Sequence, residues 1–431
     1  MTPTVPEPTK TEPTMPEPTL PDLTRAFARI GCLSFGGPAA QIALMHRDIV
    51  DDRKWISEAE YLSALSFCML LPGPEAMQLA TWIGWRSHGT VGGLIAGLLF
   101  VIPGALIVLA LSMIYMAFGQ VPLIAALFTG VQAAVVAVVI EALLRVAKRA
   151  LKTQTHWVIA GLAFAALFIF ALPFPVVIIA AGLYGFFTSP ATATVAPDAP
   201  RPWGQTLRAV AIWGTIWLAP LALLIAYHPG IYADIGIFFS KLAVVTFGGA
   251  YAVLAWMAQA VVQDKGWLTT AQMMDGLGLA ETTPGPLILV NEFVGYVAAY
   301  KQGGVPAGIF AAGITIWMTF APCFLWIFAG APWIARLTAS PRLSGALTAI
   351  TAAVVGVIAN LSLWFAVHVF FTTIGRIDLG PVHMILPDLT SVRPLMAGLA
   401  AAAAYLLLRL HIMLPLVLLL AAVTSAGLSL I

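Results

Sequence analysis

Charged residues are scarce in this chain. They make up only 9% of its 431 residues, whereas 60% are hydrophobic. A soluble globular protein carries about 25% charged residues. So few charges cannot keep a folded surface hydrated, and the lipid bilayer must be the solvent instead. The apolar runs are long and continuous rather than alternating, which favours membrane-spanning helices over a β-barrel.

Several chemical signatures are also missing. The three cysteines, Cys32, Cys68 and Cys323, are far apart and should pack as small buried hydrophobic residues, with no disulfide or metal spacing. The net charge of +2 is too small to indicate a nucleic-acid partner. No nucleotide-binding motif, catalytic triad or metal cluster is present, so we expect no enzyme, no cofactor and no ATP-driven transport. The first 20 residues lack the apolar segment of a cleavable signal peptide.

The hydrophobic segments predict an all-α polytopic membrane protein. Residues 1–21 form a Pro-, Thr- and Glu-rich tail that should be disordered. A first repeat is expected over 22–188, a linker with one unpaired helix over 189–230, and a second repeat over 231–431. The thirteen expected spans are 23–46, 58–85, 90–118, 121–145, 156–171, 173–188, 207–226, 231–262, 268–299, 304–333, 343–371, 393–409 and 411–430.

Two glycine–proline signatures recur 212 residues apart without a gap. The first comprises Phe35-Gly36-Gly37, Trp55 and Pro72-Gly73-Pro74, and the second comprises Phe247-Gly248-Gly249, Trp267 and Pro284-Gly285-Pro286. An internal repeat in so apolar a chain is typical of transporters built from two related halves. The two tryptophans are expected in the interfacial aromatic belts.

The distribution of basic residues predicts the topology. If all thirteen segments span, the side that carries the N-terminus holds more than twice as many Lys and Arg residues as the other side. This bias predicts a cytoplasmic N-terminus and an external C-terminus. Six spans plus the unpaired segment make an odd number, so the second repeat should be inverted. If the Pro-Gly-Pro segments were re-entrant and the Phe-Gly-Gly segments still spanned, the repeats would instead be parallel.

The Pro-Gly-Pro triplets should break their helices, because proline lacks an N–H and glycine is free in φ. Broken backbone inside a membrane must be buried in protein or line a polar cavity. The new helix N-terminus then offers N–H donors to an anion. We therefore expect a mid-membrane anion site, unless these residues only allow tight packing and kinks. The expected site residues are Gly36, Gly37, Pro72, Gly73, Pro74, Gly248, Gly249, Pro284, Gly285 and Pro286.

Three basic residues are candidates for meeting an anion. Lys241 lies seven residues before Gly248, two helical turns away on one face, and is a candidate counter-charge in the site. Its alternative is to extend toward the membrane interface. Arg47 and Arg86 flank the first repeat's signatures and either recruit an anion or anchor helix ends.

Acidic residues beside the breaks are candidates for proton coupling: Glu75, Glu281 and Glu292, with Asp275 a little further off. A carboxyl group in low-dielectric surroundings holds a proton more readily. The alternative for Glu75 is a carboxylate that satisfies local N–H groups at the start of a helix. Glu141 and Arg145, spaced i and i+4, should form a structural ion pair.

Together these motifs resemble the chromate ion transporter family, in its long, two-domain form. The resemblance covers residues 25–430. In the first half it rests on Phe35-Gly36-Gly37-Pro38, Met45-His46-Arg47, Trp55, Pro72-Gly73-Pro74 and Gly84. In the second half it rests on Phe239, Lys241, Thr246-Phe247-Gly248-Gly249, Tyr251, Trp267, the run from Glu281 to Pro286, Phe293 and Gly295.

The resemblance implies a secondary transporter in the bacterial inner membrane that exports chromate and gives resistance to it. Its partners would be the oxyanion and the lipid bilayer, and a homodimer is compatible with it. Chromate is a tetrahedral dianion similar in shape to sulfate, so sulfate or another divalent oxyanion remains the alternative substrate. Family members are often neutral after the first Pro-Gly-Pro, where this chain has Glu75. An integral-membrane enzyme is disfavoured because the seven histidines are scattered.

Overall fold

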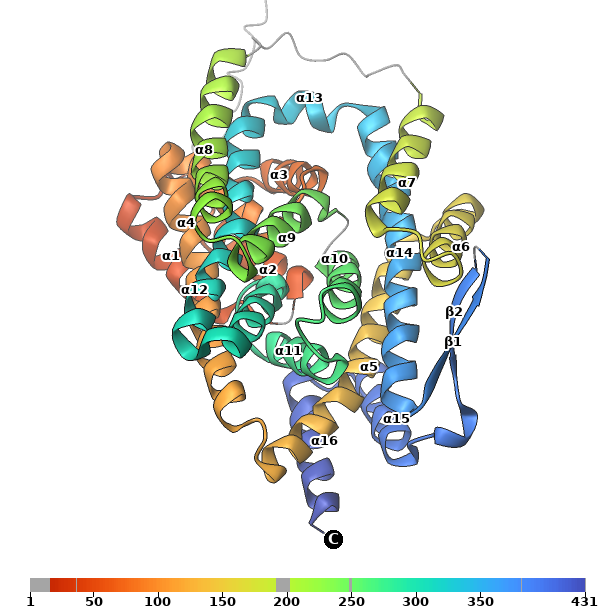
Figure 1. The fold of residues 1–431 in the computed structure, drawn as a ribbon. Helices are drawn as coiled ribbons and strands as arrows, with labels where there is room; N and C mark the ends of the chain where they lie inside the picture. Colours follow the sequence, from red (N-terminus) through yellow and green to blue (C-terminus); the bar gives the residue numbers. More distant parts are fainter. Residues whose placement is uncertain (1–15, 36, 191–201, 248–249, 381, 431) are drawn as a thin grey trace, which may run out of the picture.

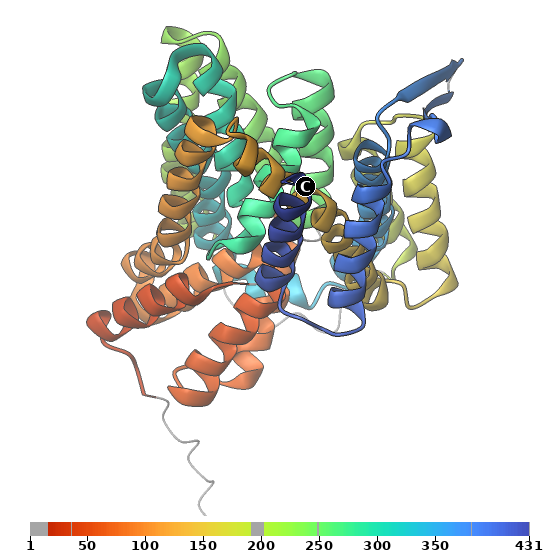
Figure 2. The same cartoon turned by 90° about the horizontal axis from the view of Figure 1, so that it is seen from below.

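The structure is a computed structural model, and it describes residues 16–35, 37–190, 202–247, 250–380 and 382–430. The expected disorder of the first fifteen residues lies outside this range. Helices make up nearly all of the described chain, as the sequence predicts (Figure 1). The exception is an antiparallel hairpin of β1 (Ile374–Leu379) and β2 (Val382–Pro387), in a stretch to which the sequence assigned no element. Figure 2 shows this hairpin at the edge of the molecule.

The helices of the two halves follow one another in the same order. The first half contains α1 (Leu20–Leu33), α2 (Gly37–His46), α3 (Glu58–Leu70), α4 (Glu75–Phe118), α5 (Pro122–Ala150), α6 (Gln154–Phe168) and α7 (Phe174–Thr188). After α8 (Trp203–Tyr227), the second half contains α9 (Ile231–Val245), α10 (Ala250–Gln259), α11 (Thr270–Thr282), α12 (Val290–Gly330), α13 (Ile334–Thr338), α14 (Pro341–Phe370), α15 (Pro394–Leu408) and α16 (Leu414–Ser429).

The repeat extends to local irregularities. A short π-helical segment follows α2 at Arg47–Asp52, and another follows α10 at Ala260–Asp264. The Arg53 guanidinium lies 5.0 Å from the Trp55 ring centre, and the Lys265 ammonium lies 5.7 Å from that of Trp267. Trp267 is buried against Phe238, so it does not belong to an exposed interfacial belt as expected.

Four of the expected spans fold back on themselves. Arg86 Nε lies 2.7 Å from Glu60 Oε1, although the two residues would be about 39 Å apart on a straight helix. Residues 58–87 therefore form a hairpin of α3 and the first arm of α4. In the second half, Lys301 Nζ contacts Gln272 Oε1 at 3.1 Å and closes the corresponding hairpin of α11 and α12.

The Phe-Gly-Gly segments fold back in the same way. Arg29 of α1 lies 3.5 Å from Asp48, which follows α2. Phe238 of α9 packs on Trp256 of α10 with 5.6 Å between ring centres. Helices of 13 to 15 residues are about 20 Å long, too short for a hydrocarbon core about 30 Å thick. Pro and Gly break these segments, so their hydrophobicity overstates how far each one reaches.

The two halves interlock. α6 and α7 of the first half pack against α14 of the second, whereas α15 and α16 pack against α5. Glycines allow this closeness: a Cβ on Gly130 would lie 2.1 Å from the Ala421 carbonyl oxygen, and one on Gly185 would lie 2.2 Å from that of Gly345. The long helices α4 and α12 pack together in the other part of the molecule.

Corresponding helices run in opposite directions. In Figure 1, α4 descends and α5 returns upward, whereas α12 ascends and α14 descends. The upper end carries α13 and the start of α8, and we call it the α13 face. Among the described residues, five helices are long and apolar enough to cross a membrane: those over 75–118, 122–150, 203–227, 287–338 and 341–370.

Candidate functional site

Helices α1, α3, α9 and α11 end near the middle of the molecule, where α2, α4, α10 and α12 begin. At the two Pro-Gly-Pro turns the glycine adopts a backbone angle that other residues rarely take. The φ of Gly73 is +123° and that of Gly285 is +95°. Pro74 and Pro286 follow in extended conformation. Pro74 directly precedes α4, and Pro286 precedes a 3-10 turn at Leu287–Leu289 that leads into α12. The sequence prediction that these triplets break their helices is therefore confirmed.

The two Pro-Gly-Pro turns cross over between the halves. Gly73 N–H donates to the Thr246 carbonyl oxygen at 2.8 Å, and Gly285 N–H donates to the Ser34 carbonyl oxygen, also at 2.8 Å. Ser34 and Thr246 are themselves 212 residues apart, so the two bonds are equivalent under the repeat. Each turn is thus fixed to the helix break of the other half, and the two breaks form one central structure.

The helices that start at these turns are uncapped. Neither Pro74 nor Pro286 makes a side-chain capping bond. In contrast, α3 and α11, which begin near the surface, are capped by Ser57 and Thr269. The first N–H groups of a helix have no partner within it. The central helix starts therefore keep N–H donors and a positive partial charge, which suit an anion.

Two buried glutamines line the central breaks. Gln41 Nε2 donates to the Gly285 carbonyl oxygen at 2.6 Å and to that of Ser34 at 3.3 Å. Gln78 Nε2 donates to the Pro72 carbonyl oxygen at 2.7 Å. Sequence reasoning missed both residues. Their signal was an uncharged polar residue four positions after Gly37 and after Pro74 in otherwise apolar helices.

A close backbone approach tightens the second turn. A Cβ added to Gly104 of α4 would lie 2.2 Å from the Pro284 carbonyl oxygen. The first half's long helix thus presses against the second half's break. Pro72, Gly73, Pro74, Pro284, Gly285 and Pro286 all lie in the central structure, and Gly37 begins α2 beside it with a φ of +78°. Gly36, Gly248 and Gly249 lie outside the described residues.

The candidate cations lie elsewhere. The side chains of Lys241 and Arg47 are exposed, and within the described residues neither makes an ion pair. Arg86 is paired with Glu60. The structure brings none of the three into contact with the Pro-Gly-Pro turns.

The candidate acids have different surroundings. Glu75 is half-buried in the first turn of α4. Glu281 is buried and accepts a hydrogen bond of 2.6 Å from the Tyr251 hydroxyl. Glu292 is buried, and its Oε2 has no partner among the described residues. Asp275 accepts bonds from Tyr115 and Gln132, and so ties α11 to α4 and α5.

The ion pair of Arg86 and Glu60 allows a test of whether Arg86 anchors a helix end or recruits an anion. We expect the double variant Glu60→Arg/Arg86→Glu to transport like the parent, because the exchange keeps a pair worth about 0.2–1 kcal/mol. Arg86→Glu alone should transport more slowly, because it sets two carboxylates against each other. Substrate flux into vesicles measures both variants. A double variant as slow as Arg86→Glu would show that the cation itself serves the anion.

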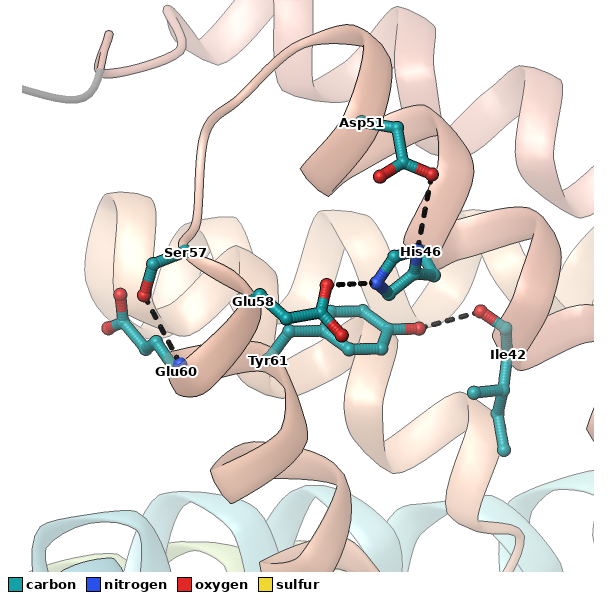
Figure 3. Close-up of polar contacts among 7 residues, drawn as sticks. All are labelled: Ile42, His46, Asp51, Ser57, Glu58, Glu60 and Tyr61. Atoms are coloured by element: carbon teal, nitrogen blue, oxygen red, sulfur yellow. Dashed lines mark hydrogen bonds and ion pairs between the residues drawn. The ribbon is translucent and has the colours of Figure 1, made fainter.

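A histidine links the first two hairpins (Figure 3). His46 Nε2 lies 2.5 Å from Glu58 Oε2, and Nδ1 lies 3.3 Å from Asp51 Oδ2. Tyr61 stands edge-on to the imidazole and donates to the Ile42 carbonyl oxygen at 2.6 Å. The hydrogen bond with Glu58 raises the pKa of His46 above its ordinary 6.5, because it favours the charged imidazolium.

This shift predicts a pH-dependent stability. A group whose pKa is raised by folding stabilises the fold below its unfolded pKa, and that contribution is lost as the pH rises through the folded pKa. His46→Gln should therefore lower stability by about 1 kcal/mol or less near pH 6, with a smaller difference near pH 8. Thermal unfolding in detergent at the two pH values measures this. A larger difference at the higher pH would contradict the assignment.

Comparisons with known proteins agree with this architecture. The family model described as "Chromate transporter" matches residues 21–186 and 233–426. A chromate transport protein of Pseudomonas aeruginosa is 35% identical over 77% of each chain. One of Cupriavidus metallidurans is 31% identical over 78% of this chain and 80% of its own. A probable chromate transport protein of Synechococcus elongatus is 29% identical over 78% of this chain and 82% of its own. No solved structure matches. With both halves matched by one family model, this chain belongs to the chromate transporter family.

Proposed function

We propose that this protein is a secondary transporter that exports chromate across the bacterial inner membrane by alternating access, and so confers resistance to chromate. The observation that carries the proposal is the pair of uncapped helix starts at the crossed Pro-Gly-Pro turns. N–H donors at a helix start can bind a dianion without a side-chain cation. The names of the relatives supply chromate as the substrate.

The substrate would bind between the two halves. The backbone N–H groups that follow Pro74 and Pro286 would donate to its oxygens. Gly37 and Gly73 would keep the backbone within reach, together with Gly285 and the glycines at 36, 248 and 249. Lys241, Arg47 and Arg86 would act before this step, by attracting the anion toward the protein from outside the central breaks. Each turn is hydrogen-bonded to the helix break of the other half, so the site lies where the two halves meet. A relative movement of the halves would therefore open it to either face.

We further propose that the repeats are inverted in the membrane. Each half would have two full spans, in α4 and α5 or in α12 and α14, whereas the short helices α6 and α7, and α15 and α16, would form hairpins. With α8 the total is odd, so the second half enters from the opposite face. The opposite directions of α5 and α14 support this arrangement (Figure 1). The parallel alternative required the Phe-Gly-Gly segments to span, whereas they fold back.

The same topology would put the N-terminus in the cytoplasm. Folding back moves Arg47, Arg53 and Lys54 to the α13 face and Lys265 to the opposite face. The excess of basic residues on the N-terminal side therefore grows, as expected for a cytoplasmic face.

Labelling distinguishes hairpins from thirteen full spans. A cysteine placed at Lys54, in a background without Cys32, should react with an impermeant reagent from the same side as one placed at Thr188. Thirteen full spans would put the two positions on opposite sides. A reporter fused after Ile431 should lie across the membrane from Thr188 under either arrangement, and so serves as a control.

A coupling ion is needed to drive export, and buried acids next to the breaks are suited to carry a proton. The candidates remain Glu75, Glu281 and Glu292. A carboxylate near the substrate would repel a dianion, so chromate would bind while the carboxyl group is protonated, and loss of the proton would favour chromate release.

Everted membrane vesicles test the proposed function. Energised vesicles that contain the protein should accumulate radiolabelled chromate, and vesicles without it should not. Sulfate in excess distinguishes the two substrates. If sulfate is accumulated and excludes chromate, the protein is a sulfate transporter instead. Equal chromate uptake with and without the protein would refute transport of chromate.

A further inference from the structure

A polar cavity lies beside the end of α11, next to the second Pro-Gly-Pro turn. Its volume is about 190 Å³, and it lies between α5, α10, α11 and the turn that connects α15 to α16. Its polar lining consists of Glu141, Arg145, Tyr251, Glu281 and His411, and the remaining lining residues are apolar. Expected as a structural ion pair, Glu141 and Arg145 do form one, and they also form part of this cavity.

Glu281 occupies the inner end of the cavity. It lies in the last turn of α11, three residues before Pro284, and only 7% of its surface is exposed. Tyr251, in the first turn of α10, donates its hydroxyl hydrogen to the Glu281 carboxylate at 2.6 Å. This pair therefore connects both helix breaks of the second half.

The outer end lies at the surface of the protein. The side chains of Arg145 and Glu141 are 43% and 26% exposed, and His411 is exposed in the turn before α16. The end of α5 leads to His156, which lines a surface hollow with Pro341 at the start of α14. The start of α14 is at the α13 face (Figure 1). The cavity therefore leads from Glu281 toward that face.

The charges in the cavity favour a proton over chromate. When Glu281 is ionised, two carboxylates and one guanidinium face each other, so a dianion that entered would meet net negative charge. Buried carboxyl, hydroxyl and imidazole groups, in contrast, are groups that accept and donate protons. The Tyr251–Glu281 pair also has no equivalent in the first half. At the positions 212 residues earlier, the first half has Met69 in place of Glu281 and Ala39 in place of Tyr251.

We propose that this cavity is the path by which protons pass between Glu281 and the α13 face; this rests on the proposed chromate export. The neutral carboxyl of Glu281 gives its proton to water in the cavity, and the proton passes from there to the α13 face. The carboxylate left behind accepts the Tyr251 hydroxyl hydrogen and faces Arg145. Each proton released to the cytoplasm accompanies the outward movement of chromate.

Reconstituted purified protein tests the path with two readouts in the same liposomes. One is chromate counterflow, the exchange of labelled for unlabelled chromate, which needs no net proton movement. The other is the pH change reported by a trapped dye when chromate flows down its gradient. Glu281→Gln should keep counterflow within about twofold and lose about 100-fold in coupled proton flux, the scale of a positioned proton-transfer group. Met69→Gln, at the equivalent position, should change neither readout.

The outcomes separate the path from the transport function. Coupled proton flux at the parent rate in Glu281→Gln would overturn the path, as would loss of counterflow in that variant while it remains folded. Should it fail to fold, Tyr251→Phe keeps the ring and removes only the hydroxyl. It should slow proton flux with counterflow unchanged, and parent-like proton flux would overturn the path. Parent protein that exchanges chromate without any pH change would overturn the path alone. Parent protein without counterflow would refute the transport function and the path together.

Discussion

Gly104→Ala should reduce chromate transport by about tenfold or more, because overpacking costs about 1–3 kcal/mol and each 1.36 kcal/mol is a factor of ten in rate. The added Cβ would lie 2.2 Å from the Pro284 carbonyl oxygen. That carbonyl belongs to backbone at a helix break and not to a flexible side chain, so the break itself must move. Initial rates of chromate uptake at matched protein levels measure the effect.

Gly313→Ala provides the matched control. Gly313 lies in α12, the counterpart of α4, and a Cβ there would meet no atom within 4 Å. Its transport rate should equal that of the parent. If both alanine variants transport at the parent rate, the contact between α4 and the second break plays no part in transport.

Gln41→Leu should have a comparable effect for a different reason. The leucine keeps the apolar bulk but removes the amide that binds the Gly285 and Ser34 carbonyl oxygens. A buried carbonyl left without a donor costs about 1–3 kcal/mol. We expect about a tenfold loss of transport and a lower thermal stability.

Gln302→Leu is the corresponding control, because Gln302 is exposed near the kink of α12. It should leave transport and stability unchanged. A fully active Gln41→Leu protein would mean that the amide is dispensable and that the backbone bonds of Gly73 and Gly285 hold the breaks without it.

The repeat and the helix breaks could be predicted from the sequence, because they depend on local backbone chemistry. Proline cannot donate to a helix, and glycine at positive φ is strongly preferred, so Pro72-Gly73-Pro74 and Pro284-Gly285-Pro286 had to interrupt their segments. The number of spans could not be predicted in the same way. Hydrophobicity reports that a segment is buried in lipid or protein, and a hairpin of two short helices is as apolar as one long helix.

Contacts between residues far apart in the chain also could not be predicted from the sequence. Nothing local predicts that Gln41 reaches Gly285, or that Tyr251 reaches Glu281, since each pair is formed only when two hairpins meet. The same limit applies to Lys241. Its proximity to Gly248 along the chain predicted a place in the site, whereas its side chain is exposed on α9.

The central claim is that the crossed Pro-Gly-Pro turns form the substrate site, and chromate counterflow by purified protein in liposomes tests it most directly. The account predicts transient accumulation of labelled chromate in liposomes preloaded with unlabelled chromate. Gly104→Ala should slow this accumulation by about tenfold or more, and Gly313→Ala should not. Parent protein that is folded yet shows no counterflow, or a Gly104→Ala variant that exchanges at the parent rate, would contradict it.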